Sequence, residues 1–108
     1  MKILITTNTI PDKAGTYIVL KNIIPYLMEN NEVTILTNQC DVDIKCDNLV
    51  QLSISKIFPQ YFFTSGLSKL LDDGFFNEFD IIHAFEYPLH TTDFLTLKKS
   101  QFNVPLLI

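Results

Sequence analysis

The fold of this protein is predicted by the stretch from Lys2 to Thr37, KILITTNTIPDKAGTYIVLKNIIPYLMENNEVTILT. Its first six residues are a short, isoleucine-rich apolar run bounded by polar residues, which is typical of a buried strand. From Thr16 to Glu29 the apolar residues recur every three or four positions, which is the period of a helix. Glu32 to Thr37 has the pattern of a second strand. The stretch therefore predicts a strand, a helix and a strand, which is the repeating unit of a parallel sheet.

Polar residues mark both ends of the predicted helix. Thr16 is suited to cap its start. Asn30 and Asn31 are expected to end it, because asparagine tolerates the left-handed conformation common just past a helix. Pro25 lies inside the pattern and removes one backbone hydrogen bond. Because the apolar face continues beyond it to Met28, we expect a kink at Pro25 and not an end of the helix.

The rest of the chain continues to alternate strand and helix patterns. Asn38 to Asn48 is polar and acidic and predicts a loop, and Leu49 to Ile54 alternates as a half-exposed third strand does. The later segments are an aromatic cluster from Phe58 to Phe63, a short helix with Leu67, Leu70 and Leu71 that ends near Gly74, a fourth strand from Asp80 to Phe85, a helix from Leu89 to about Lys99, and a fifth strand from Val104 to Ile108. This order predicts a Rossmann-like α/β fold, with a largely parallel five-stranded sheet, right-handed crossovers and helices on both faces.

Composition restricts the class of protein. The 108 residues suit one domain, and 47% hydrophobic with 12% aromatic residues are enough for a core. A net charge of -4 without a basic stripe predicts no nucleic-acid partner. No segment has the ~20 apolar residues that span a bilayer, and the apolar run after Met1 is too short for a secretion signal. The expected location is cytoplasmic, with peripheral contact to a membrane surface left open.

The two cysteines do not form a recognisable metal or redox motif. Cys40 and Cys46 lie six positions apart, without C-x-x-C spacing and without neighbouring histidines. We therefore expect two reduced structural thiols. We also expect no metal and no cofactor.

Two loops are candidate binding sites, because parallel sheets bind ligands at the carboxyl ends of their strands where the strand order reverses. The first, Asn8 to Gly15, leads into a helix start at Gly15 and Thr16, whose free N–H groups could hold a phosphate or carboxylate. An ordinary strand-to-helix turn explains the same residues. Neither G-x-G-x-x-G nor G-x-x-x-x-G-K-[ST] occurs, which disfavours nicotinamide-type and P-loop sites.

The second loop follows the strand that contains His83. An imidazole there could bind a sugar hydroxyl or relay a proton, and a hydrogen-bonded core histidine is the alternative. Glu86 and His90 are further candidates for a cleft, although His90 also fits an exposed helix start. The aromatic cluster from Phe58 to Phe63 either packs on the sheet or forms an apolar lip for a lipid-linked substrate or a membrane surface. No residue is predicted to be catalytic.

Four segments carry a further pattern. They are Met1 to Thr7 (MKILITT) with Pro11 to Gly15 (PDKAG), Tyr26 to Thr37 (YLMENNEVTILT), Phe79 to His90 (FDIIHAFEYPLH), and Val104 to Ile108 (VPLLI). In this order they resemble the N-terminal domain of family 4 glycosyltransferases, enzymes of the GT-B fold that move a sugar from a nucleotide-sugar to an acceptor. The chain departs from the family pattern at Ala14, at Asn30-Asn31 and at Phe85, where glycine, Gly-His and a second histidine are usual.

The resemblance implies that residues 1–108 form a partial, acceptor-side N-terminal domain, with Gly15 and His83 as acceptor-side or cleft-facing residues. In that family a C-terminal domain binds the nucleotide-sugar and carries the glutamates that act on it. We expect this donor domain to be absent and the chain to be truncated, so that it is inactive alone. A downstream-encoded or second chain would then complete the fold, and nucleotide-sugar and acceptor would be partners only of the complete enzyme.

Two alternatives remain open at this point. The chain could be a non-catalytic Rossmann-like module that associates with a partner chain through its open sheet edge. A generic nucleotide binder is the third hypothesis, and the missing glycine fingerprint disfavours it.

Overall fold

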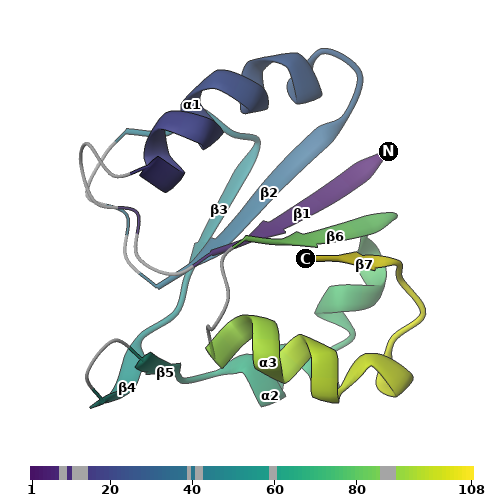
Figure 1. Cartoon of the computed structure of the whole chain (residues 1–108). Helices are drawn as coiled ribbons and strands as arrows, with labels where there is room; N and C mark the ends of the chain where they lie inside the picture. The colour runs from purple at the N-terminus through teal and green to yellow at the C-terminus, as the bar shows by residue number, and fades with distance from the viewer. Residues whose placement is uncertain (8–9, 11–14, 39, 41–42, 59–60, 86–89) are drawn as a thin grey trace.

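A five-stranded, all-parallel sheet organises the chain (Figure 1). The structure is a computed structural model that describes residues 1–7, 10, 15–38, 40, 43–58, 61–85 and 90–108. The strands of this sheet are β1 (Lys2–Thr6), β2 (Glu32–Thr37), β3 (Asn48–Gln51), β6 (Ile81–Ala84) and β7 (Leu106–Leu107). Their spatial order is β3-β2-β1-β6-β7, and every neighbouring pair is parallel. The fold is therefore Rossmann-like α/β, as the sequence predicts.

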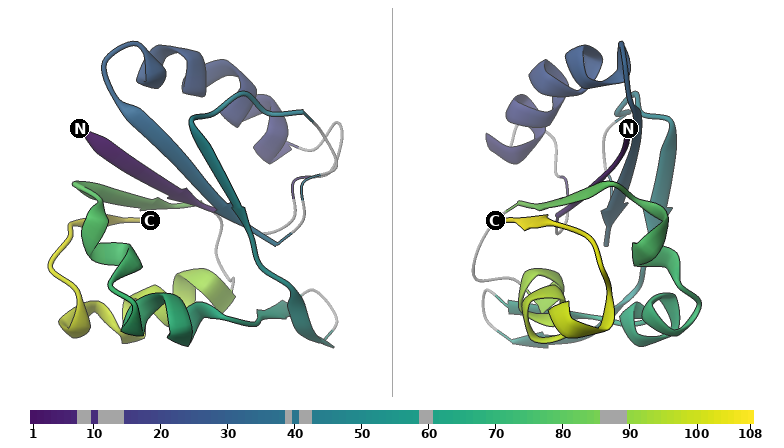
Figure 2. Two further views of the ribbon diagram at one scale, coloured as in Figure 1. Left: turned by 180° about the vertical axis from the view of Figure 1, so that it is seen from behind. Right: turned by 90° about the vertical axis from the view of Figure 1, so that its right-hand side faces the viewer.

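Helices cover both faces of the sheet, which confirms a second expectation. The helical elements are α1 (Gly15–Met28), α2 (Leu67–Asp72), the short 3-10 helix η1 (Phe75–Glu78), α3 (His90–Leu97) and a second 3-10 helix η2 (Lys99–Gln101). Figure 2 shows α1 on one side of the sheet and α2 and α3 on the other. None of the helices in the described ranges is long and apolar enough to cross a membrane.

Strand alternation builds two separate cores. Ile3 and Ile5 of β1 point to the α1 face and pack in one cluster with Leu20 and Ile24 of that helix. Leu4 points to the opposite face, where a second cluster forms. This second cluster contains Leu4, Leu36, Leu67, Phe76, Phe79, Ile82, Leu95, Phe102 and Val104. We call these two sides the α1 face and the α3 face.

The ends of α1 differ slightly from the prediction. The helix begins at Gly15, one residue early, so Thr16 lies in the first turn and not at the capping position. Pro25 lies inside the helix, which continues to Met28 as expected. The side chain of Asn31 donates from Nδ2 to the Leu27 carbonyl oxygen at 2.9 Å. This bond satisfies a carbonyl that the helix end would otherwise leave unpaired.

The predicted third strand from Leu49 to Ile54 is wrong in its extent. β3 ends at Gln51, and Ile54 begins a hairpin of β4 (Ile54–Phe58) and β5 (Tyr61–Thr64) that forms a second, antiparallel sheet. The aromatic segment is thus part of this hairpin. The sequence did not reveal the change of partner, because the alternation of apolar and polar residues continues through the point where the chain leaves the sheet.

The last two predicted elements are shorter in the structure. α3 ends at Leu97, and the chain tightens into η2 from Lys99. β7 pairs over two residues only, Leu106 and Leu107. Pro105 before them has no N–H to donate, and the side chain of Val104 is buried in the core. The Pro105 carbonyl oxygen still accepts a hydrogen bond from the Ile82 N–H at 2.9 Å. Pro105 thus joins the end of the chain to β6.

Candidate functional site

The strand order reverses beside β1. The chain passes from β1 to β2 and β3 on one side, and then crosses to β6 on the other side of β1. Backbone bonds extend both pairings past the strand ends, since the Thr7 N–H donates to the Leu36 oxygen at 3.0 Å and the Phe85 N–H donates to the Thr6 oxygen at 2.8 Å. All strands end at the same edge because the sheet is parallel. This carboxyl edge is where such folds bind ligands.

Three buried polar side chains stand at this edge. Thr6 is the last residue of β1 and is 0% exposed, Thr7 follows it at 1%, and Asn38 follows β2 at 8%. Among the described residues, Thr6 Oγ1, Thr7 Oγ1 and Asn38 Oδ1 have no hydrogen-bond partner. Buried polar atoms in folded proteins are normally bonded, to protein, water or ligand. The edge therefore offers three oxygens that a bound water or ligand group can satisfy.

A hydrogen-bond network ties this edge to α3. Asn38 donates from Nδ2 to Thr64 Oγ1 at 2.6 Å, and Thr91 Oγ1 lies 3.4 Å from the same hydroxyl. The Thr64 N–H donates to His90 Nδ1 at 2.9 Å. The residue after β2, the end of β5 and the start of α3 are thus held together on the α3 face. This network forms a fixed polar wall beside the sheet edge.

His90 is part of that wall. Its ring is half-buried, with its centroid 5.0 Å from that of Phe63 and 6.5 Å from that of Phe94. Burial lowers the pKa of His90, and the nearby Asp93 carboxylate partly opposes this. An imidazole that accepts at Nδ1 carries its proton on Nε2 when it is neutral. His90 is therefore a packed and hydrogen-bonded residue at the start of α3, not an exposed one.

His83 lies on the other side of the sheet. It alternates with Ile82 and Ala84 along β6, and Ile81 and Phe85 on its own side pack against the α1 face cluster. Its ring centroid is 4.4 Å from that of Phe85. Burial lowers the pKa of His83, so the ring is neutral at pH 7 with one donor and one acceptor nitrogen. Within the described part of the chain, no hydrogen bond is made to this ring.

The structure does not gather all predicted site residues in one place. His83 and His90 are separated by the sheet, so they cannot act on one small group together. Gly15 is the exposed first residue of α1, and a Cβ placed on it would meet no atom within 4 Å. The open space beside Gly15 leaves room for a ligand. The packing around this position does not require a glycine. Glu86 and the side chain of Thr16 lie outside the described residues.

Sequence reasoning missed the buried oxygens at the sheet edge. A signal was present, because the first two strands end alike, in Ile-Thr-Thr-Asn from Ile5 and in Leu-Thr-Asn from Leu36. Alternation places these threonines in the interior, where an apolar residue is usual. Polar residues at two adjacent buried strand ends would have indicated this edge.

The remaining predicted features have structural roles. Cys40 and Cys46 are half-buried thiols, not joined by a disulfide, that pack against the α1 face cluster. Burial, and then the charge of Asp47, raises the pKa of the Cys46 thiol, which disfavours a reactive thiolate. In the ranges that the structure describes, no three His, Cys, Asp or Glu residues are close enough to hold a metal ion.

Comparison with known proteins adds no identity. No protein-family model matches the chain, and searches of curated proteins and of solved structures find no significant match.

Proposed function

We propose that this chain is the acceptor-binding part of a sugar-transferring enzyme of the glycosyltransferase type. Its four ordered sequence segments support this proposal. The observation that carries it is the neutral, half-buried His83 at the carboxyl end of β6, beside the point where the strand order reverses. Among the described residues, no hydrogen bond is made to the nitrogen atoms of this imidazole.

The chemistry of this ring suits a sugar hydroxyl. A neutral imidazole donates one hydrogen bond and accepts another, as a hydroxyl also does. The lowered pKa keeps the accepting nitrogen unprotonated at pH 7, which is the state needed to take a proton from an attacking hydroxyl. The adjacent Phe85 ring, 4.4 Å away, provides an apolar surface beside the polar group.

The chain is proposed to bind an acceptor without transferring sugar by itself. Transfer requires groups that stabilise the leaving nucleotide. The resemblance implies that these groups belong to a donor-side domain, which another polypeptide segment would supply. The acceptor then approaches the donor across the carboxyl edge of the sheet.

Backbone NMR spectra test this proposal. A panel of mono- and oligosaccharides is titrated into the chain, and nucleotide-sugars are titrated separately. We expect at least one saccharide to shift the amide signals of Thr7, His83 and Phe85, and His83→Ala to weaken its binding by about tenfold, ~1.4 kcal/mol. Lys69→Ala on the exposed surface of α2 is the matched control and should leave binding unchanged.

Two results would overturn it. If no saccharide perturbs the carboxyl edge, the chain is not an acceptor-binding domain. If the chain alone converts a nucleotide-sugar and His83→Ala abolishes this, the proposed need for a donor-side segment is wrong.

A second candidate function is association through the sheet edge, and exposed apolar residues favour it. Leu97, Leu107 and Ile108 are 80%, 51% and 64% exposed, next to the edge strand β7. Leu97 and Ile108 also line a hollow of about 580 Å³ with Phe63 and Phe94. Analytical ultracentrifugation tests this, because edge pairing predicts a concentration-dependent dimer that Leu107→Lys disrupts. A well-folded monomer at high concentration would argue against it.

A further inference from the structure

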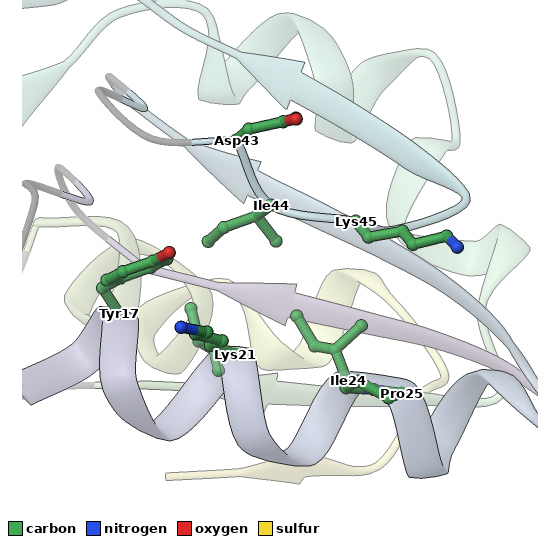
Figure 3. A pocket seen from close by; sticks show the side chains of 8 residues that line it. Tyr17, Lys21, Ile24, Pro25, Asp43, Ile44 and Lys45 are labelled. Carbon is green, nitrogen blue, oxygen red and sulfur yellow. The ribbon is translucent and has the colours of Figure 1, made fainter.

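A groove on the α1 face is not explained by the function proposed above. It lies between α1 and residues 43–45, encloses about 210 Å³, and is shown in Figure 3. None of the residues that line it belongs to the carboxyl-edge site. A cavity of about 150 Å³ is enough to hold a benzene molecule, so the groove has room for a small organic ligand.

The floor of the groove is apolar. Leu20 and Ile24 of α1 are 0% and 1% exposed and belong to the α1 face cluster. Ile44 from the facing segment packs against the same cluster, and Figure 3 shows Ile24 and Ile44 pointing toward one another. A hydrocarbon chain laid on this floor would be removed from water on one side.

The rim of the groove is cationic. Lys21 on α1 and Lys45 on the facing segment both line it, and α1 contains no acidic residue. The Lys21 Nζ is 5.9 Å from the ring centroid of Tyr17, and Figure 3 shows the two side chains together at one end. Among the described residues neither ammonium group forms an ion pair. Asp43 is the single carboxylate among the groove's lining residues.

The groove continues along the helix. A second hollow of about 250 Å³ shares Pro25 and Lys45 with the first and adds Met28 and Glu29. From Tyr17 to Met28 the helix rises about 17 Å, which is longer than a small ring compound needs. The long apolar floor and the two cations favour an extended ligand with one charged end.

We propose that this groove binds a single-chain amphiphile with an anionic head group. The head group lies between the ammonium groups of Lys21 and Lys45, and the aliphatic tail lies over Ile24, Pro25 and Met28. This proposal does not depend on the chain being a glycosyltransferase domain.

Methyl NMR with decanoate as the probe tests the proposal at pH 7, below the micelle concentration. We expect decanoate to shift the methyl signals of Ile24 and Ile44, and decanol, its neutral counterpart, to bind about tenfold more weakly. Lys21→Gln and Lys45→Gln should each weaken decanoate binding about threefold, and Asp43→Asn should strengthen it about twofold. Lys69→Gln on α2 is the matched control. All four substitutions are at the protein surface, and circular dichroism checks that each variant is folded.

The same experiment distinguishes a free amphiphile from a lipid surface. Phosphatidylglycerol vesicles replace decanoate in a parallel arm, and the proposal expects decanoate alone to shift the groove methyls. The proposal is overturned if decanol binds as tightly as decanoate, or if decanoate shifts Leu97 and Ile108 and not the groove. It is also overturned if vesicles bind the chain while decanoate shifts neither groove isoleucine, because the lysines would then serve a membrane surface.

Discussion

The two faces of the sheet are built differently. The α3 face has an aromatic core in which Phe76, Phe79 and Phe102 are buried. At the carboxyl edge of the sheet, hydrogen bonds on this face join Asn38 to Thr64 and Thr64 to His90. The α1 face is covered by one helix over a cluster whose buried members are all aliphatic. The α1 face also contains a groove, two cysteine thiols and the half-buried His83. The α3 face thus has the larger core and contains aromatic rings, whereas the α1 face has the smaller, aliphatic core and a groove beside its helix.

The same contrast holds for the two histidines. Burial lowers the pKa of both rings, but only His90 has an identified hydrogen-bond partner in the protein, the Thr64 N–H. His83 has an aromatic neighbour, Phe85, and no hydrogen bond within the described residues. A histidine already used by the fold is a poor ligand-binding group. Of the two rings, His83 is therefore the better candidate for contacting a ligand.

The largest expected effect comes from removing an aromatic ring on the α3 face. Phe76 is 1% exposed, and its ring centroid lies 5.3 Å from that of Phe75 and 5.9 Å from that of Phe102. Phe76→Ala should lower the free energy of unfolding by about 3–5 kcal/mol. Ile24→Ala on the α1 face should cost about 2 kcal/mol, because the neighbouring groove already limits its packing. Urea denaturation measures both, and equal losses would remove the distinction between the faces.

The next largest effect comes from removing a hydrogen bond in the polar wall formed by Asn38, Thr64, His90 and Thr91. Asn38→Ala removes the 2.6 Å bond to Thr64 Oγ1 and should cost about 1 kcal/mol, since a net hydrogen bond contributes about that much. Asn48→Ala is the matched control, because Asn48 is exposed and its side chain donates to Glu32 Oε1 at 3.1 Å and to Thr34 Oγ1 at 3.3 Å. We expect it to change stability by less than about 0.5 kcal/mol. A larger loss at Asn48 than at Asn38 would show that the wall does not stabilise the fold.

The sequence was sufficient for most of the fold because hydrophobic periodicity is a local signal. The helix from Thr16 and the strands from Lys2 and Glu32 were predicted within one residue at each end, since buried apolar runs bounded by polar residues specify them. The hairpin after Ile54 was missed. The alternating run that predicts a third strand continues to Ile54, and which strand pairs with which is decided by contacts between distant residues.

The candidate site was less predictable than the fold. The sequence predicts that His83 lies near the carboxyl edge, because it comes near the end of a strand, and the structure has it in β6 as expected. The sequence could not separate His83 from His90, since the face on which each ring lies depends on the sheet and on α3. The unpaired oxygens of Thr6, Thr7 and Asn38 are likewise a property of the packed structure.

Gly15 offers a smaller test of the α1 face. A Cβ at this position meets no atom within 4 Å, so Gly15→Ala should fit at the start of α1. It should raise the free energy of unfolding by about 0.4–1 kcal/mol, because alanine has less conformational freedom to lose on folding. Thermal unfolding followed by circular dichroism measures this. A loss of stability would mean that the backbone at the helix start needs glycine, as a tight turn or close ligand approach would require.

The smallest expected effect is a pH dependence shared by both faces. Burial is the main cause that lowers the pKa of His83 and of His90 below the ordinary value of about 6.5. Below that value the unfolded chain binds more protons than the folded one, so stability is full above about pH 6.5 and falls as the pH decreases toward the folded pKa values. The effect is small because both rings are only half-buried. Urea denaturation between pH 7.5 and 5 measures it, with His83→Gln and His90→Gln as variants. Each variant should reduce the change in the free energy of unfolding between pH 7.5 and 5. A variant that leaves this change unaltered would show that its ring is not desolvated in the folded protein.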